Sequence, residues 1–173
     1  SDLSPESQAL ARKLANGDAG ARPAIGFSVM ALANPYFEQM VAGMQAEVDQ
    51  RGAELLVEDA QFDAKKLSDQ IDAFIAQKVK AIVLAPMGPA AVGPAIKRAN
   101  SAGIPVFTVD AECTAEGVKI TGHVGNDNYQ GGQLAGQAMI EALGPKGGKV
   151  LVLGYKLASA CVQRVEGFRE VID

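Results

Sequence analysis

The stretch Asn34-Pro35-Tyr36-Phe37 carries the side chains of this sequence that are best suited to hold a small polar ligand. An apolar run at 24–30 precedes it, and apolar residues at helical spacing follow it until Gly52. Pro35 lacks an N–H and has a preset φ, so it suits the first helical turn, and Asn34 suits the N-cap. We therefore predict that a buried strand ends, and a helix begins, at this stretch.

Such a junction is a common place for a ligand site. In an open α/β sheet, ligands bind where the carboxyl ends of the strands meet the N-termini of the following helices. The amide of Asn34 supplies hydrogen bonds, and the rings of Tyr36 and Phe37 supply apolar faces, so together they suit a small, polar, ring-shaped ligand. The alternative interpretation is that Asn34 only caps the helix and Phe37 only belongs to the core.

Other residue patterns give no sign of catalysis. His123 is the only histidine, and no carboxylate or cysteine lies at ligand spacing from it, so we interpret it as a structural residue. No G-x-G-x-x-G motif follows the first apolar run, where a dinucleotide fold requires it. The sequence also shows no Ser/His/Asp or Cys/His arrangement. We therefore predict no catalytic residue, no metal site and no cofactor.

Composition limits the classes of protein to consider. The 173 residues, 48% hydrophobic and 21% charged, fit one globular domain or one plus part of another. The net charge of −4 gives no electrostatic reason to expect nucleic acid as a partner. No apolar run approaches the roughly 18 residues of a membrane span. Residues 1–21 lack the basic start and apolar centre of a signal peptide, so either none exists or it has been removed, and we expect an N-terminal extension with one short helix.

From residue 24 onward, strand patterns alternate with helix patterns. Because parallel strands are joined by right-handed crossovers, the alternation predicts an α/β fold: a Rossmann-like parallel sheet with helices on both faces. The predicted strands are 24–30, 54–59, 79–85, 104–109, 119–124 and, after a Gly/Pro break, 150–153; the predicted helices are 35–51, 64–77, 89–102, 128–143 and 161–172. Gly131, Gly132 and Gly136 fall inside a predicted helix, where close packing explains them better than phosphate binding.

Five segments then indicate a family. They are NPYFEQMVAGM, KAIVLAP, IPVFTVD, VGNDNYQGGQLAG and RVEGF. In this order and spacing, across residues 23–172, they resemble the ribose-binding class of bacterial periplasmic sugar-binding proteins, which shares its core with lac-repressor-type regulators. The resemblance implies two Rossmann-like lobes that are joined by a hinge and close on a monosaccharide. On that layout 1–21 is the extension, 22–125 is a nearly complete first lobe, and 126–173 is the hinge crossover and the start of the second lobe.

The resemblance also implies the residues of the sugar site. Asn34 matches the asparagine that binds sugar hydroxyls, while Tyr36 and Phe37 match the aromatic pair that packs on the sugar ring. Asp110 matches the acid that accepts hydrogen bonds from neighbouring hydroxyls, as a carboxylate does strongly. Arg164 matches the second-lobe arginine that donates across the cleft. The structural alternatives are a helix cap for Asp110 and a surface ion pair for Arg164.

The function implied by the resemblance is transport. Members of the class deliver the sugar to the membrane permease of an ABC transporter, in the bacterial periplasm, after a signal peptide has been removed. The alternative is the effector-binding core of a lac-repressor-type transcription regulator, whose DNA-binding headpiece needs about 50 to 60 residues before the core. Only 23 residues precede Ala24. A sugar-modifying enzyme is disfavoured because the sequence shows no nucleophile, base or cofactor loop.

Two departures from the family pattern leave the identity of the sugar open. Ribose binders usually have arginine directly after the acid that ends strand four, and this chain has Ala111. They also tend to have Asn-Pro at the end of strand three, where this chain has Ala85-Pro86-Met87. Two polar partners of ribose are thus missing. A different aldose, a deoxy sugar and a polyol remain candidates beside ribose.

The two cysteines fall near the implied site. On the family layout Cys113 lies three residues past Asp110, at the mouth of lobe one, and Cys161 lies three residues before Arg164, at the mouth of lobe two. An oxidising periplasm permits a disulfide. A bridge across the cleft, however, would hinder the opening that releases the sugar, so we expect two thiols.

The last residues of the chain suggest a fragment. Asp173 follows directly on a predicted helix with no glycine stop, whereas a family member continues and completes lobe two. We therefore expect the apolar faces of 150–153 and of the last helix to lack their usual cover. We also expect the isolated chain to bind sugar more weakly than an intact family member.

Overall fold

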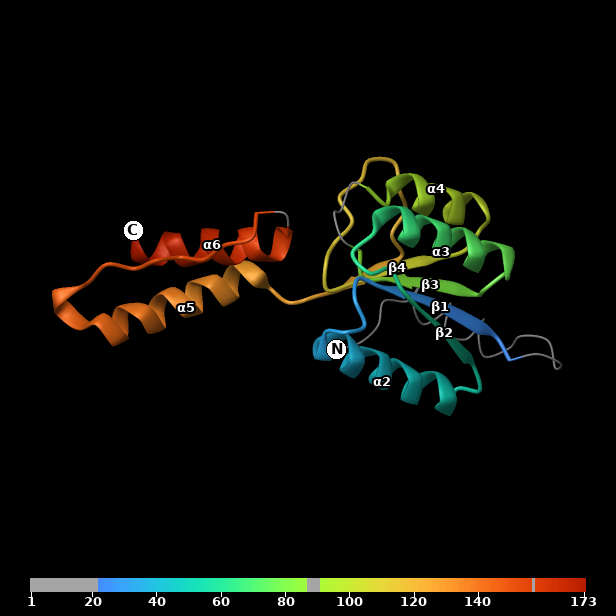
Figure 1. Cartoon of the computed structure of the whole chain (residues 1–173), viewed down its shortest axis with the longest axis horizontal. Helices are drawn as coiled ribbons and strands as arrows, with labels where there is room; N and C mark the ends of the chain where they lie inside the picture. Colours follow the sequence, from blue (N-terminus) through green and yellow to red (C-terminus); the bar gives the residue numbers. More distant parts are fainter. Residues whose placement is uncertain (1–21, 87–90, 157) are drawn as a thin grey trace. The chain divides into compact units, whose positions relative to one another are not determined.

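The computed structural model describes residues 22–86, 91–156 and 158–173. It contains two compact units, which meet in the sequence between Val124 and Gly125. The short helix expected within residues 1–21 lies outside the described residues. Figure 1 shows the first unit as a sheet with helices and the second as a pair of helices.

The first unit is a five-stranded parallel sheet in the order β2-β1-β3-β4-β5. Its strands are β1 (Ala24–Val29), β2 (Glu54–Asp59), β3 (Ala81–Leu84), β4 (Val106–Val109) and β5 (Gly122–Val124). Its helices are α2 (Pro35–Gln50), α3 (Ala64–Ala76) and α4 (Gly93–Ser101). Figure 1 shows α2 on one face of the sheet and α3 and α4 on the other. The predicted parallel sheet with helices on both faces is therefore confirmed.

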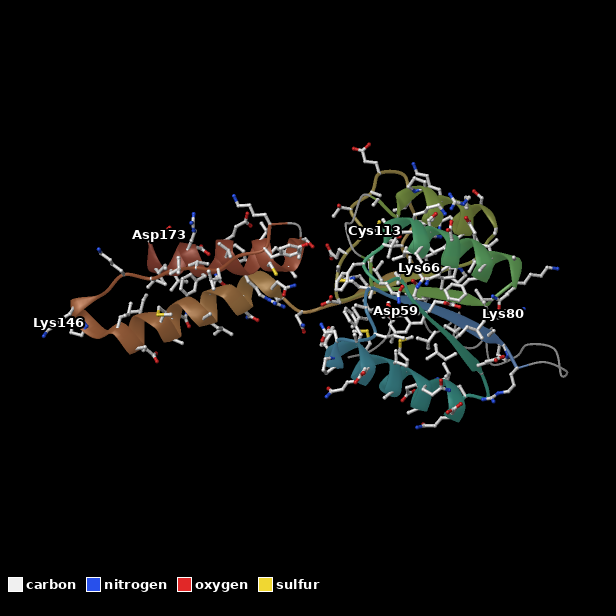
Figure 2. The ribbon with its side chains drawn as sticks, viewed as in Figure 1. Asp59, Lys66, Lys80, Cys113, Lys146 and Asp173 are labelled. Carbon is white, nitrogen blue, oxygen red and sulfur yellow. The ribbon has the colours of Figure 1, made fainter. Side chains whose placement is uncertain are left out.

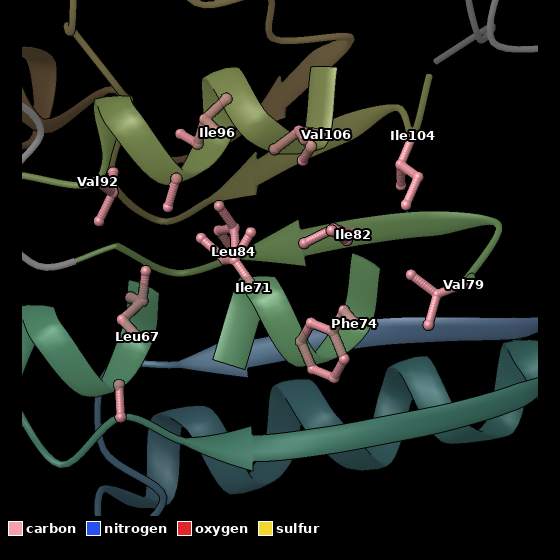
Figure 3. Packing of buried hydrophobic residues seen from close by; sticks show 13 residues of the cluster. Leu67, Ile71, Phe74, Val79, Ile82, Leu84, Val92, Ile96, Ile104 and Val106 are labelled. Carbon is pink, nitrogen blue, oxygen red and sulfur yellow. The ribbon is translucent and has the colours of Figure 1, made fainter. Parts of the chain in front are cut away.

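Two apolar clusters hold these layers together, one on each face of the sheet. Under α2 lie Phe27 and Val29 of β1, with Phe37 and Val48 of the helix. The other cluster, seen in Figure 3, joins α3, α4 and the middle of the sheet; its larger members are Leu67, Ile71, Phe74, Ile82, Leu84, Val92, Ile96 and Val106. Because successive strand residues point to opposite faces, one strand contributes to both clusters.

The second unit contains α5 (Asn128–Leu143), the short 3-10 helix η1 (Gly144–Lys146) and α6 (Ser159–Ile172). The backbone of α6 approaches α5 so closely that a Cβ at Gly132 would collide with the carbonyl of Arg164. Likewise, a Cβ at Gly167 would collide with the carbonyl of Tyr129. Close packing therefore explains Gly132, as predicted, whereas a Cβ at Gly131 would meet no neighbour within 4 Å.

The helices α5 and α6 run parallel, and side chains join them as well as backbone. Gly132 packs against Arg164 and Phe168, and Gly136, one turn later, packs against Phe168 and Val171. A parallel helix pair needs a long return segment between its two members, and in Figure 1 residues 147–156 and 158 form the described part of it.

One predicted element is wrong and others are shorter than predicted. Residues 150–153 do not form a strand, because no neighbouring strand in the described part of the second unit pairs with them. Leu151 and Leu153 are consequently 84% and 90% exposed. The strand predicted at 119–124 begins only at Gly122, and the helix predicted at 89–102 spans Gly93–Ser101.

Candidate functional site

The candidate site lies at the carboxyl edge of the first unit's sheet. In Figure 2, Asp59 and Cys113 lie toward that edge, while Lys80 lies at the amino end of β3. Ala85 and Pro86, which follow β3 in the middle of the sheet, are buried and apolar. The described segment after β3 therefore offers no polar side chain, and the predicted polar groups of the site come from the segments after β1 and β4.

Asn34 is the N-cap of α2, as predicted. Its backbone is extended, and its Oδ1 accepts a hydrogen bond of 3.0 Å from the backbone N–H of Tyr36. Pro35 fills the first helical position, where no N–H is needed. The side-chain oxygen of Asn34 is thus used in the capping hydrogen bond. Because Asn34 is exposed, its side-chain NH₂ group is available to donate to a ligand.

The two predicted aromatic contacts differ sharply in exposure. Tyr36 is 44% exposed, whereas Phe37 is 3% exposed and packs in the core cluster under α2. Their rings meet edge to face, with centroids 5.2 Å apart and an interplanar angle of 74°. Tyr36 therefore presents the accessible ring, and Phe37 supports it from the core.

Asp110 follows β4 in an unusual backbone conformation. Its φ is 65°, and the N–H of Ala111 donates to the carbonyl of Val109 at 2.8 Å, so Asp110 is the central residue of a tight three-residue turn. This turn type, with positive φ, is rare and strained, although aspartate tolerates it better than most residues. The N–H of Asp110 donates to Val124 at the end of β5. The carboxylate is thus carried on a backbone that is fixed on both sides.

Tyr36 and Asp110 come together although 74 residues separate them in the sequence. The hydroxyl of Tyr36 donates to Oδ1 of Asp110 over 3.4 Å. Their parent strands β1 and β4 are separated by β3, so the tyrosine side chain reaches across the end of β3. The edge therefore combines an amide, an accessible ring, a hydroxyl and a carboxylate.

Arg164, the fifth predicted residue, belongs to the second unit. It lies on α6 with an exposed side chain, and its backbone carbonyl packs on Gly132. The structure therefore groups Asn34, Tyr36 and Asp110 on one edge, and the role of Arg164 stays a prediction.

A buried polar network supports this edge from below. Ser28 of β1 is fully buried and donates to Oε1 of Gln70 at 2.7 Å. The amide nitrogen of Gln70 in turn donates to the backbone carbonyl of Asp59 at the end of β2, at 2.9 Å. Because each of these buried groups is satisfied, the network fixes α3 against the ends of β1 and β2.

His123 has the structural role that was predicted, with a neighbour that the sequence did not reveal. On β5, its Nδ1 lies 2.9 Å from the hydroxyl of buried Thr108. Its Nε2 lies 4.0 Å from Oε1 of Glu112, which the loop after Asp110 brings back to the strand. Within the described ranges, no group of three or more histidine, cysteine or acidic side chains is arranged to hold a metal ion.

The two cysteines do not form a disulfide with each other. Cys113 and Cys161 are both thiols and both half-buried, and they belong to different units.

None of the helices in the described part of the chain is long and apolar enough to cross a membrane.

Comparisons with known proteins converge on one family. A family model described as a periplasmic binding protein domain matches residues 25–173. The chain is 37% identical to the ribose import binding protein of Bacillus subtilis (strain 168) over 150 residues, which are 86% of this chain and 48% of that protein. It is 36% identical to the D-apiose import binding protein of Paraburkholderia graminis over 159 residues, 92% of this chain and 51% of that protein.

A solved structure gives the same picture. The myo-inositol binding protein of Caulobacter, solved with myo-inositol bound, superposes with a TM-score of 0.80 at 25% identity. The match covers 90% of this chain and 52% of that one. The chain thus spans about half the length of the relatives that it matches.

Proposed function

Because the chain belongs to the family of periplasmic binding protein domains, we propose that it binds a monosaccharide or related polyol and delivers it to the permease of an ABC transporter. The proposed location is the bacterial periplasm, after removal of a signal peptide. The observation that carries the proposal is the meeting of Tyr36 and Asp110 at the carboxyl edge of the sheet. The matched relatives, which are named as import binding proteins, support it.

The three grouped side chains suit a neutral polyhydroxyl ligand. The exposed ring of Tyr36 covers a C–H face of the sugar, which is apolar. The carboxylate of Asp110 accepts hydrogen bonds from neighbouring hydroxyls, and the NH₂ group of Asn34 donates to a hydroxyl oxygen. This combination of one acceptor, one donor and one flat face fixes the orientation of a small ring.

The remaining two residues have proposed supporting roles. Phe37 holds the ring of Tyr36 through the edge-to-face contact. Arg164, on the second unit, keeps its predicted role as a hydrogen-bond donor to the sugar. The alternative function, the effector-binding core of a transcription regulator, is not favoured, because the matched relatives are binding proteins of import systems. The same relatives favour binding over enzymatic turnover.

A thermal-shift screen of the full-length protein tests the proposal. The probes are D-ribose, D-apiose and myo-inositol, with sodium D-glucuronate as an anionic comparison. A ligand that binds only the native state raises the apparent melting temperature, and the rise grows with the ratio of ligand concentration to dissociation constant. We expect at least one of the three neutral probes to raise it and glucuronate to leave it unchanged. No shift with any neutral sugar or polyol at millimolar concentration would contradict the proposal.

A further inference from the structure

Tyr36 carries a hydroxyl that stacking on a sugar does not require. We propose that this hydroxyl makes Tyr36 a positioning residue, which orients the carboxylate of Asp110 before the ligand arrives. The inference rests on the proposed function of the same site. It adds a role for one atom, the Tyr36 Oη, that a phenylalanine at this position would lack.

The first step of the argument is that the position of Tyr36 is fixed. It is the second residue of α2, directly after the Asn34 cap and Pro35, and its own N–H is held by the cap. The adjacent Phe37 is anchored in the core and packs edge to face on the tyrosine ring. The backbone and the ring that carry this hydroxyl are therefore both held in place.

The second step concerns what remains free in Asp110. The tight turn from Val109 to Ala111 and the bond from its N–H to Val124 set the direction of its Cα–Cβ bond. These backbone contacts do not set the rotation of the carboxylate about χ1 and χ2. The 3.4 Å contact from the Tyr36 hydroxyl to Oδ1 supplies that missing restraint.

The third step is the consequence for binding. A carboxylate has about four acceptor positions, so one bond from Tyr36 leaves acceptor capacity for two ligand hydroxyls. Ordering a side chain in advance removes an entropic cost that the ligand would otherwise have to offset on binding. The hydroxyl of Tyr36 therefore increases affinity through Asp110, without itself touching the ligand.

Tyr36→Phe tests this role because it keeps the ring and removes only the hydroxyl. With the neutral probe that gives the largest thermal shift, we expect its dissociation constant to rise about 3- to 10-fold, the range for one modest hydrogen bond. Tyr129→Phe is the matched control: it removes a hydroxyl that donates to a carboxylate, Glu170, at 2.6 Å on the second unit. We expect the control to leave affinity unchanged.

A double-mutant cycle separates positioning from direct contact. Asp110→Gly removes the carboxylate, and glycine adopts the positive φ of this position without strain. If Tyr36 acts through Asp110, Tyr36→Phe causes no further loss in the Asp110→Gly background. An equal loss in both backgrounds, or none in the parent protein, overturns the inference.

The cycle also distinguishes the inference from the proposed function beneath it. Loss of affinity in Asp110→Gly with none in Tyr36→Phe removes the positioning role and leaves the sugar site standing. Unchanged affinity in Asp110→Gly overturns the inference and removes Asp110 from the site, because the carboxylate that Tyr36 would orient then contributes nothing to binding. The proposed function itself is overturned only if no neutral probe binds.

Discussion

The backbone N–H of Asp110 donates to the carbonyl of Val124, 2.9 Å away. Val124 is the last residue of the first unit, and the chain passes from it into the second unit. The backbone of the residue proposed to bind the ligand is therefore hydrogen-bonded to the end of β5, just before the crossover. A change in the turn around Asp110 acts directly on this last residue of the first unit.

Asp110→Gly should separate binding from stability. Loss of the carboxylate leaves ligand hydroxyls without a charged acceptor, so we expect affinity to fall by about 1 to 3 kcal/mol, roughly 5- to 150-fold. Stability should not fall, because glycine is at ease at a φ of 65°. Calorimetric titration and thermal unfolding measure the two effects. Asp69→Ala, which removes an exposed carboxylate paired with Lys65 on α3, serves as the control and should leave affinity unchanged.

Phe62 is the bulkiest residue of the chain's described part that has a positive φ, 58°, and it is 58% exposed. Left-handed backbone costs a residue with a Cβ about 1 to 2 kcal/mol, and asparagine tolerates it best among such residues. Phe62→Asn should therefore raise the free energy of unfolding by about 1 kcal/mol. Tyr155→Asn removes an equally exposed aromatic side chain that has no positive φ. An equal gain in both variants would show that relief of strain is not the cause.

The contact between α5 and α6 predicts a contrast between two neighbouring glycines. Gly132→Ala pushes a methyl group into the backbone of α6 and should destabilise the second unit by about 1 to 3 kcal/mol. Gly131→Ala meets nothing within 4 Å, so it should be neutral or stabilise by up to about 1 kcal/mol through helix propensity. Amide hydrogen exchange of α6 reports on both. Equal protection in the two variants would contradict the close approach.

Glu170 gives the second unit a specific pH dependence. A hydrogen bond from Tyr129, and to a smaller extent one from Gln133, lowers the pKa of Glu170 below its ordinary value. A carboxyl whose folded pKa is lowered stabilises the fold above its unfolded pKa and loses that contribution as the pH falls through the folded pKa. Tyr129→Phe should therefore move the pKa of Glu170 up toward its ordinary value, as an NMR titration of the side-chain carboxyl would show. Tyr155→Phe, far from Glu170 in the sequence, should leave this titration unchanged.

The isolated chain 1–173 should bind sugar weakly. It spans about half the length of its relatives, and small-molecule sites usually bury most of the ligand surface. With about half of such a protein around it, the sugar keeps more of its surface in water, so we expect a dissociation constant of about 1 mM or weaker. The ribose import binding protein of Bacillus subtilis, measured with D-ribose in parallel, is the reference. Micromolar binding by the isolated monomer would show that one edge suffices.

The sequence predicted best what depends on local periodicity. The helix from Pro35 could be placed because a cap former, a proline and a helical apolar pattern agree at one point. The strand predicted at 150–153 failed because a strand also needs a partner, and an apolar run does not contain that information.

The site was only partly predictable for a related reason. Tyr36 and Phe37 look equivalent in the sequence, but the helix turns one ring toward solvent and the other into the core. The bond from Tyr36 to Asp110 and the approach of Glu112 to His123 depend on how separate loops end at one edge. No periodic pattern in the sequence encodes such contacts between loops. The turn at Asp110 was not predictable either, because it requires a positive φ that a non-glycine residue seldom adopts.

The unpaired segment at 150–153 has a consequence for handling the chain in solution. It forms no strand and carries no charged side chain, and it exposes two leucine side chains almost completely. Such a segment forms intermolecular backbone hydrogen bonds readily, and a net charge of −4 spread over 173 residues opposes this only weakly. We therefore expect Leu151→Lys or Leu153→Lys to reduce association of the chain at high concentration.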